Sequence, residues 1–131
     1  MSALYLDSSA FVKLAVEESE TAALRQFLAE RASRRVSSAL LRTEALRAVR
    51  HLGPDALASV REAIRRVDLV AIDDRILDAA GTLEPRVLRT LDAIHLATAM
   101  AMGDDLDAIV TYDDRMVEAA GLLGLLVAAP R

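Results

Sequence analysis

The chain has 131 residues, of which 53% are hydrophobic, a formal net charge of −4 and no cysteine. These values predict one folded domain over residues 1–131 and exclude disulfides and thiolate metal sites. Aromatic residues make up only 3% of the chain, which argues against binding of nucleic acid by base stacking. No apolar run reaches the length of a membrane span, so we expect a cytoplasmic protein without membrane contact.

The N-terminal stretch predicts a buried strand that ends at a carboxylate. Ala3-Leu4-Tyr5-Leu6 is an apolar run, Asp7 follows it, and a helix with Phe11 on its apolar face comes next. A polar residue at the carboxyl end of a strand lies where open α/β sheets bind ligands. The alternative is that Asp7 or Ser8 only caps the helix.

The next segment predicts two helices separated by a short strand. Residues 19–35 favour a helix closed by arginines, because cations suit a helix C-terminus. Residues 36–38 predict a strand, and the following helix carries Glu44 among its apolar positions. Arg47 lies three residues beyond Glu44, so a surface ion pair is the alternative explanation of that acid.

Gly53-Pro54 marks a break and the start of another helix, which we expect to run to about residue 67. The apolar run 69–72 predicts a third strand. Asp73 and Asp74 then fit the N-terminal cap of a helix that reaches about residue 83. Residues 85–90 predict a loop.

The stretch 91–103 predicts a helix that is apolar on most faces and therefore lies in the interior. Asp92 stands at its start, although a buried carboxylate is costly unless it is hydrogen-bonded, paired or bound to a metal. His95, on the same helix, is interpreted as an interior histidine with satisfied hydrogen bonds.

The C-terminal part predicts a solvated connection over 104–107, a strand over 108–111, a turn that carries Asp113 and Asp114, a final helix and a short strand over 125–127. Strands thus alternate with helices along the whole chain. That pattern predicts an α/β fold in which a mostly parallel central sheet of four to five strands is flanked by helices on both faces.

Four acids could meet at one edge of such a sheet, because the carboxyl ends of parallel strands lie together. They are Asp7, Glu44, Asp92 and Asp113. Converging carboxylates repel one another without a cation, and an all-oxygen ligand set suits Mg²⁺ or Mn²⁺. Such a site supports the hydrolysis of phosphodiesters.

The sequence resembles the PIN-domain family, and most of all its VapC toxins. The resemblance rests on Leu6-Asp7-Ser8-Ser9-Ala10-Phe11, Glu44, Leu91-Asp92-Ala93-Ile94-His95-Leu96-Ala97 and Val110-Thr111-Tyr112-Asp113. It implies a three-layer sandwich, Mg²⁺-dependent endoribonuclease activity on RNA with Mn²⁺ as a possible substitute, an antitoxin encoded nearby and a homodimer.

The resemblance also implies roles for individual residues. Asp7 and Asp92 would be the principal metal ligands, Asp113 would bind directly or through water, and Glu44 would ligate the metal or orient the attacking water. Three side chains would support this set: Ser8, Thr111 and Asp114. Two groups of arginines are candidates for guiding RNA: Arg42, Arg47 and Arg50, or Arg86 and Arg89.

Two other functions stay open at this point. One is a Mg²⁺-dependent phosphoryl-transfer domain of the receiver or dehalogenase kind, although Asp7-Ser8-Ser9 fits the acidic pattern of neither. The other is a catalytically silent interaction module in which the acids serve only as helix caps.

Overall fold

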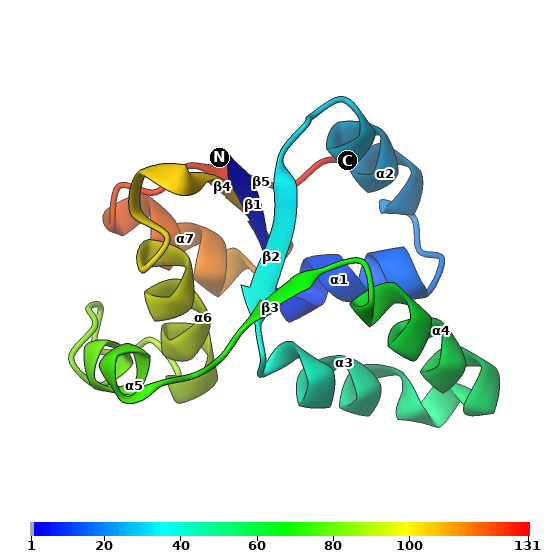
Figure 1. Cartoon of the computed structure of the whole chain (residues 1–131), viewed down its shortest axis with the longest axis horizontal. Coiled ribbons are helices and arrows are strands. Elements are labelled where there is room, and N and C mark those ends of the chain that lie inside the picture. The colour runs from blue at the N-terminus through cyan, green and yellow to red at the C-terminus, as the bar shows by residue number, and fades with distance from the viewer. Residues whose placement is uncertain (1) are drawn as a thin grey trace.

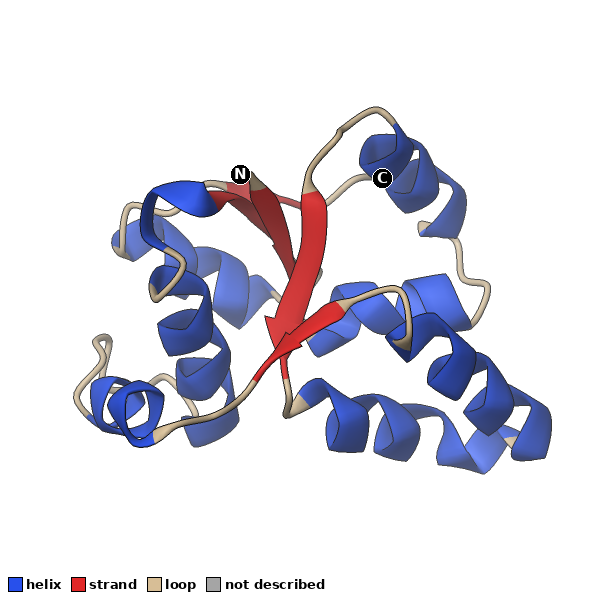
Figure 2. Ribbon diagram, viewed as in Figure 1, coloured by secondary structure: helices blue, strands red, loops and turns tan. Residues whose placement is uncertain are grey.

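The computed structural model describes residues 2–131 and has a five-stranded, all-parallel sheet at its centre (Figures 1 and 2). The strands are β1 (Ala3–Leu6), β2 (Arg34–Ser38), β3 (Asp68–Val70), β4 (Leu106–Val110) and β5 (Val127–Ala128), in the order β3-β2-β1-β4-β5. The predicted α/β fold is confirmed, and every strand pair described is parallel.

Within residues 2–131, seven helices and two 3₁₀ turns connect the strands. They are α1 (Ser8–Ala15), α2 (Thr21–Ala29), α3 (Leu41–Val49), η1 (Arg50–Leu52), α4 (Pro54–Ile64), α5 (Asp74–Gly81), α6 (Thr90–Met100), η2 (Gly103–Asp105) and α7 (Asp114–Leu122). Among residues 2–131, none of these helices is both long and apolar enough to cross a membrane.

The alternation of side chains along the strands divides the core into two layers. Leu4 and Leu6 of β1 point to one face, where they pack with Phe11 of α1 and with side chains of α2, α3 and α4. Ala3 and Tyr5 point to the other face, where α6 and α7 pack. Figure 1 shows these two groups of helices on opposite sides of the sheet, with α5 outside α6. Because both faces are covered, the central strand β1 is apolar throughout.

The structure shifts several predicted boundaries. Arg34 and Arg35 do not close a helix but begin β2, where they pair with Ala3 and Leu4. Since β3 pairs with β2 only from Val36 onward, this end of β2 extends past its neighbour, and the arginine side chains reach solvent there. The helix predicted to run to about residue 67 ends at Ile64, and the third strand begins one residue early, at Asp68.

The C-terminal boundaries move as well. Residues 104–107 are not a plain connection, because η2 ends at Asp105 and β4 already begins at Leu106. The last strand is Val127–Ala128 instead of 125–127. It pairs in parallel with Ile109 and Val110.

The order of the strands fixes the place of the site. From β1 the chain moves outward to β2 and β3, and it later returns to the opposite side of β1 to form β4 and β5. The order in which strands are added to the sheet therefore reverses between β1 and β4. In open α/β sheets, the carboxyl ends of the two strands at such a reversal form the ligand-binding crevice. Asp7 follows β1 at this place, and Thr111 follows β4.

Candidate active site

Asp7 is buried at the start of α1, with 4% of its surface exposed. Its Oδ1 accepts hydrogen bonds from the Ala10 amide at 3.0 Å and from the Ser9 hydroxyl at 2.7 Å. Its Oδ2 accepts one from the hydroxyl of Thr111. Burial raises the pKa of Asp7, although the Ser9, Thr111 and Ala10 donors act in the opposite direction. Asp7 thus caps the helix and also stands at the end of β1, so both explanations of its position hold.

Ser9 is a contact that the sequence interpretation missed. Besides donating to Asp7, its oxygen accepts a hydrogen bond from the Tyr112 amide at 2.9 Å. It therefore ties the turn after β4 to the start of α1. A second hydroxyl next to Ser8, in the first turn of a helix whose cap is an acid, is the only signal that the sequence offered.

Glu44 projects from α3 and is half-buried. Its Oε1 accepts hydrogen bonds from the Ser8 hydroxyl and from Nε2 of His95, each at 2.5 Å. Burial by itself would raise the pKa of Glu44, but the hydrogen bonds from His95 and Ser8 lower it below the usual value. Among residues 2–131 Glu44 pairs with His95 and not with Arg47, so the surface ion pair is not formed.

Asp92 lies in the first turn of α6 and is partly buried. Within residues 2–131 its carboxylate has no hydrogen bond or ion pair. Its pKa is raised by burial first, then by the charges of Asp113, Asp7 and Glu44, while His95 acts in the opposite direction. The four predicted acids are therefore close enough to influence one another, and Asp92 is the one without a partner.

Asp113 is the N-terminal cap of α7, where its Oδ1 accepts from the Arg115 amide at 2.9 Å. The Thr111 hydroxyl oxygen accepts from the Asp113 amide at 3.1 Å, so Thr111 links Asp113 to Asp7. Asp114 is the first residue of α7 and is exposed. The charge that acts on Asp92 is that of Asp113, which favours Asp113 over Asp114 as the residue that faces the other acids.

His95 is interior, with 2% of its surface exposed, and both ring nitrogens are hydrogen-bonded. This agrees with the interpretation as a satisfied interior histidine. One of its partners, however, is Glu44, so the residue is part of the site as well as of the core.

The four acids are near one another but do not form a compact cluster of ligands. In the part of the chain that the structure describes, no three Asp, Glu or His side chains approach closely enough to hold one ion by themselves. The donor set nevertheless fits a hard cation, because it consists of carboxylates and one of them lacks any partner. Mg²⁺ commonly keeps several waters and is bound through one or two carboxylates, which suits acids at this spacing.

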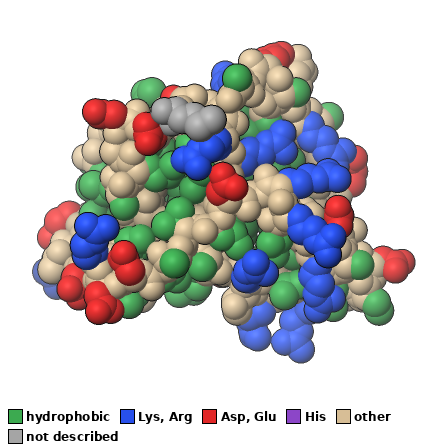
Figure 3. Space-filling model, viewed as in Figure 1, with side chains coloured by type: hydrophobic (Ala, Val, Ile, Leu, Met, Phe, Trp, Pro, Cys, Tyr) green, Lys and Arg blue, Asp and Glu red, His purple; other side chains and the backbone are tan. Residues whose placement is uncertain are grey.

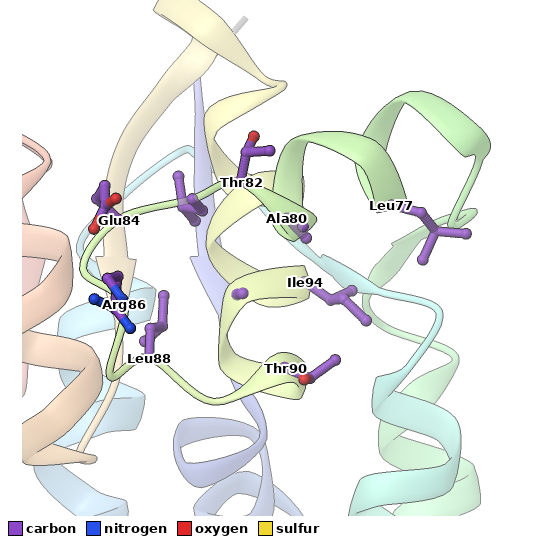
Figure 4. A pocket seen from close by; sticks show the side chains of 11 residues that line it. Leu77, Ala80, Thr82, Glu84, Arg86, Leu88, Thr90 and Ile94 are labelled. Carbon is purple, nitrogen blue, oxygen red and sulfur yellow. The ribbon is translucent and has the colours of Figure 1, made fainter.

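Two hollows flank the start of α6. One, of about 470 Å³, is lined by Asp92, by Arg89 and Arg115 and by apolar side chains that include Val87 and Leu122. The other, of about 370 Å³, lies between α5, the loop over 82–90 and α6; Figure 4 shows Leu77 and Ile94 on its wall. The second hollow contains none of the four acids, so the first is the one that belongs to the site.

Comparisons of sequence and of structure with known proteins all indicate the same family. A family model described as the PIN domain matches residues 4–122. The chain is 55% identical to ribonuclease VapC46 of Mycobacterium tuberculosis over 130 residues, which covers 99% of each protein. It is 44% identical to ribonuclease VapC35 of the same species, covering 97% of this chain and 96% of the relative.

Two solved structures share the fold at lower identity. Mycobacterium tuberculosis VapC20, a toxin that cleaves the sarcin–ricin loop, has a TM-score of 0.77 and 16% identity over 98% of this chain and 100% of its own. A chain of a toxin–antitoxin complex from Klebsiella pneumoniae has a TM-score of 0.74 and 23% identity over 99% and 98%. The receiver and dehalogenase alternatives are thereby overturned. The chain belongs to the PIN-domain family and is a homologue of the VapC ribonucleases.

Proposed function

We propose that this chain is a Mg²⁺-dependent endoribonuclease that acts in the cytoplasm as the toxin of a toxin–antitoxin pair. The observation that carries the proposal is Asp92, a partly buried carboxylate without a partner among residues 2–131 and with a pKa raised by burial and by Asp113, Asp7 and Glu44. A protein that keeps such a charge uncompensated is prepared for a cation. Similarity to VapC46 and VapC35, both named ribonucleases, supports RNA as the substrate.

In this mechanism Asp7 and Asp92 would hold the metal and Asp113 would bind it directly or through water; Mn²⁺ can replace Mg²⁺ because both prefer oxygen ligands. When bound, the metal lowers the pKa of coordinated water and neutralises charge on the phosphoryl oxygens. Glu44 would ligate the metal or orient the attacking water by accepting its hydrogen bond. Thr111 and Ser9 keep the Asp7 carboxylate in place. The attack is in line on the phosphodiester and needs no 2′-hydroxyl nucleophile.

The distribution of charge supports a path for the RNA backbone. Residues 34–66 contain eight arginines against three acids, a formal charge of +5 in a chain of −4. In the view of Figure 3, Lys and Arg side chains gather over the half of the molecule that contains β2, α3 and α4. Arg47 is exposed and lies one helical turn from Glu44. We therefore favour Arg42 and Arg47 of α3 together with Arg50 of η1 as the group that holds phosphates next to the site.

The hollow beside Asp92 is the place proposed for the antitoxin. Val87 is 89% exposed and Leu122 is 70% exposed, and together with Leu88 they form an apolar wall that leads to Asp92. An apolar segment of the partner that carries an arginine would cover this wall and pair with the free carboxylate. The family resemblance also leads us to propose a homodimer. Light scattering of the purified protein measures its oligomeric state.

The test is cleavage of a panel of structured RNAs by purified protein with Mg²⁺, Mn²⁺ or EDTA. We expect metal-dependent cleavage that Asp92→Asn reduces by at least about 100-fold, since transition-state charge stabilisation of this kind is worth that much. Asp104→Asn removes an equal charge from the exposed turn η2 and serves as the matched control with wild-type activity. If RNA is held by arginines, KM rises with salt concentration.

Equal cleavage by the wild type and Asp92→Asn would refute the site. If neither protein cleaves, titration calorimetry with Mn²⁺ decides between a target missing from the panel and a silent module, because a silent module binds no metal.

A further inference from the structure

A chain of side-chain hydrogen bonds runs from the middle of the core to the acidic site. The Tyr5 hydroxyl of β1 lies 2.6 Å from Nδ1 of His95 on α6. The other ring nitrogen, Nε2, is bonded to Oε1 of Glu44 on α3. The chain therefore connects three elements that are far apart in the sequence, and it ends on a residue of the proposed active site.

The two inner members of this hydrogen-bond network are buried. Tyr5 is 1% exposed and His95 is 2% exposed. In the part of the chain that the structure describes, every buried side-chain nitrogen and oxygen has a hydrogen-bond partner. Since water does not compete for these groups, the partners within the protein determine where each proton lies.

The positions of the protons follow from the donors and acceptors. A phenol is protonated at neutral pH, so the Tyr5 hydroxyl has one hydrogen to donate. A phenol that donates this hydrogen to Nδ1 of His95 leaves the ring proton on Nε2, which then donates to Oε1 of Glu44.

This arrangement treats the two oxygens of Glu44 differently. Oε1 accepts from both His95 and Ser8, which uses the two lone pairs of a carboxylate oxygen. Oε2 has no hydrogen bond among residues 2–131. The carboxylate is thus held by one oxygen, and its charge acts on the neighbouring Asp92.

We propose that His95 and Tyr5 are positioning residues, in which Tyr5 fixes the Nε2–H tautomer of His95 and His95 anchors Oε1 of Glu44, so that Oε2 is presented to the metal or to the attacking water. This inference rests on the proposed nuclease function. Partners of this kind, one step behind a metal-binding carboxylate, typically contribute 10- to 100-fold in metal affinity or activity.

The tautomer is tested in the metal-free protein by long-range ¹H–¹⁵N NMR of the histidine rings. The chain has only two histidines, and exposed His51 on η1 is an internal reference. We expect His95 to show the Nε2–H form and its Nδ1 resonance to shift in Tyr5→Phe. Tyr112→Phe is the matched control, because it removes the only other phenol, which donates to the Pro130 carbonyl. An Nδ1–H form, or an unchanged spectrum in Tyr5→Phe, would overturn the proposal.

The positioning role is tested by Mn²⁺ calorimetry and by cleavage with His95→Leu and His95→Gln. We expect His95→Leu to lose about 10- to 100-fold in Mn²⁺ affinity or kcat. His95→Gln should recover most of that loss, because its amide can still donate to Glu44. A residue that only packs the core would change thermal stability alone, so folded His95→Leu protein with wild-type affinity and rate would refute the role.

The two proposals fail in different ways. If the wild type binds no Mn²⁺ and cleaves no RNA, the nuclease function fails and the positioning role fails with it, whatever tautomer is found. If the wild type is active and His95→Leu is equally active, only the positioning role is refuted.

Discussion

Asp7 and Asp92 stand at the same edge of the sheet with the same charge, yet the protein surrounds them differently. Asp7 is 4% exposed and accepts three hydrogen bonds, from Ser9, Ala10 and Thr111. Asp92 is more open, and within residues 2–131 no side chain or amide bonds to its carboxylate. Burial raises the pKa of both residues. For Asp7 the three hydrogen-bond donors act to lower the pKa, whereas for Asp92 the neighbouring acids raise it further.

The difference separates two tasks that one kind of side chain can perform. The contacts of Asp7 are part of the fold, since they start α1 and join it to the turn after β4. The charge of Asp92 is left for something outside the chain to compensate. Substitutions should therefore affect stability in opposite directions at the two positions, although both should abolish cleavage.

The largest effect on stability is expected for Asp7→Ala. It removes a helix cap, worth about 1 kcal/mol, and leaves the buried Thr111 hydroxyl without its acceptor, which costs about 1–3 kcal/mol. Relief of the buried charge offsets a part of this, so we expect a net loss of about 2 kcal/mol in the free energy of unfolding. Urea denaturation measures it. Asp7→Asn, which keeps an acceptor at the cap, should lose less, and an Asp7→Ala protein as stable as the wild type would contradict this account.

The same contrast explains what the sequence could predict. A carboxylate directly after an apolar strand places Asp7 at the sheet edge, and a charge at the start of an apolar helix identifies Asp92 as unusual. Both conclusions depend on one element and its neighbours in the chain. The strand boundaries at Arg34 and Arg35 were missed because cations suit a helix end as well as the exposed end of a strand.

The contacts of Glu44 were out of reach for the same reason. A helical glutamate with an arginine three residues away fits a surface ion pair from local spacing alone. Its actual partners, Ser8 and His95, come from two other helices. Only the packing of α1, α3 and α6 brings them together, and no spacing within one element carries that information.

A smaller effect, of opposite sign, is expected for Asp92→Asn in the metal-free protein. The raised pKa of Asp92 means that the folded state binds a proton more readily than the unfolded state, so its ionised form lowers stability as pH rises through that pKa. At neutral pH the variant should be more stable than the wild type by roughly 0.2–1 kcal/mol, since solvent screens this partly exposed charge.

Thermal unfolding in EDTA across pH measures this difference. It should shrink as pH falls through the raised pKa of Asp92 and disappear below the ordinary pKa of an aspartate, where the carboxyl is protonated in both the folded and the unfolded state. Addition of Mg²⁺ should stabilise the wild type and not the variant. A variant that is less stable than the wild type at neutral pH in EDTA would show that Asp92 has a partner within the fold.

The smallest effect on stability is expected for Asp113→Asn and Asp114→Asn, which distinguish two adjacent acids. Asparagine caps a helix as well as aspartate does, so the bond from the Arg115 amide survives in Asp113→Asn. Asp114 is exposed and has no such bond among residues 2–131. Both variants should therefore have a free energy of unfolding within about 0.5 kcal/mol of the wild type.

Mn²⁺ calorimetry and RNA cleavage should separate the two variants, because of these two acids only Asp113 acts on the charge of Asp92. We expect a loss of at least about 10-fold for Asp113→Asn and at most a few-fold for Asp114→Asn. The reverse order would place Asp114 at the metal and would mean that the turn after β4 presents the next residue of the chain.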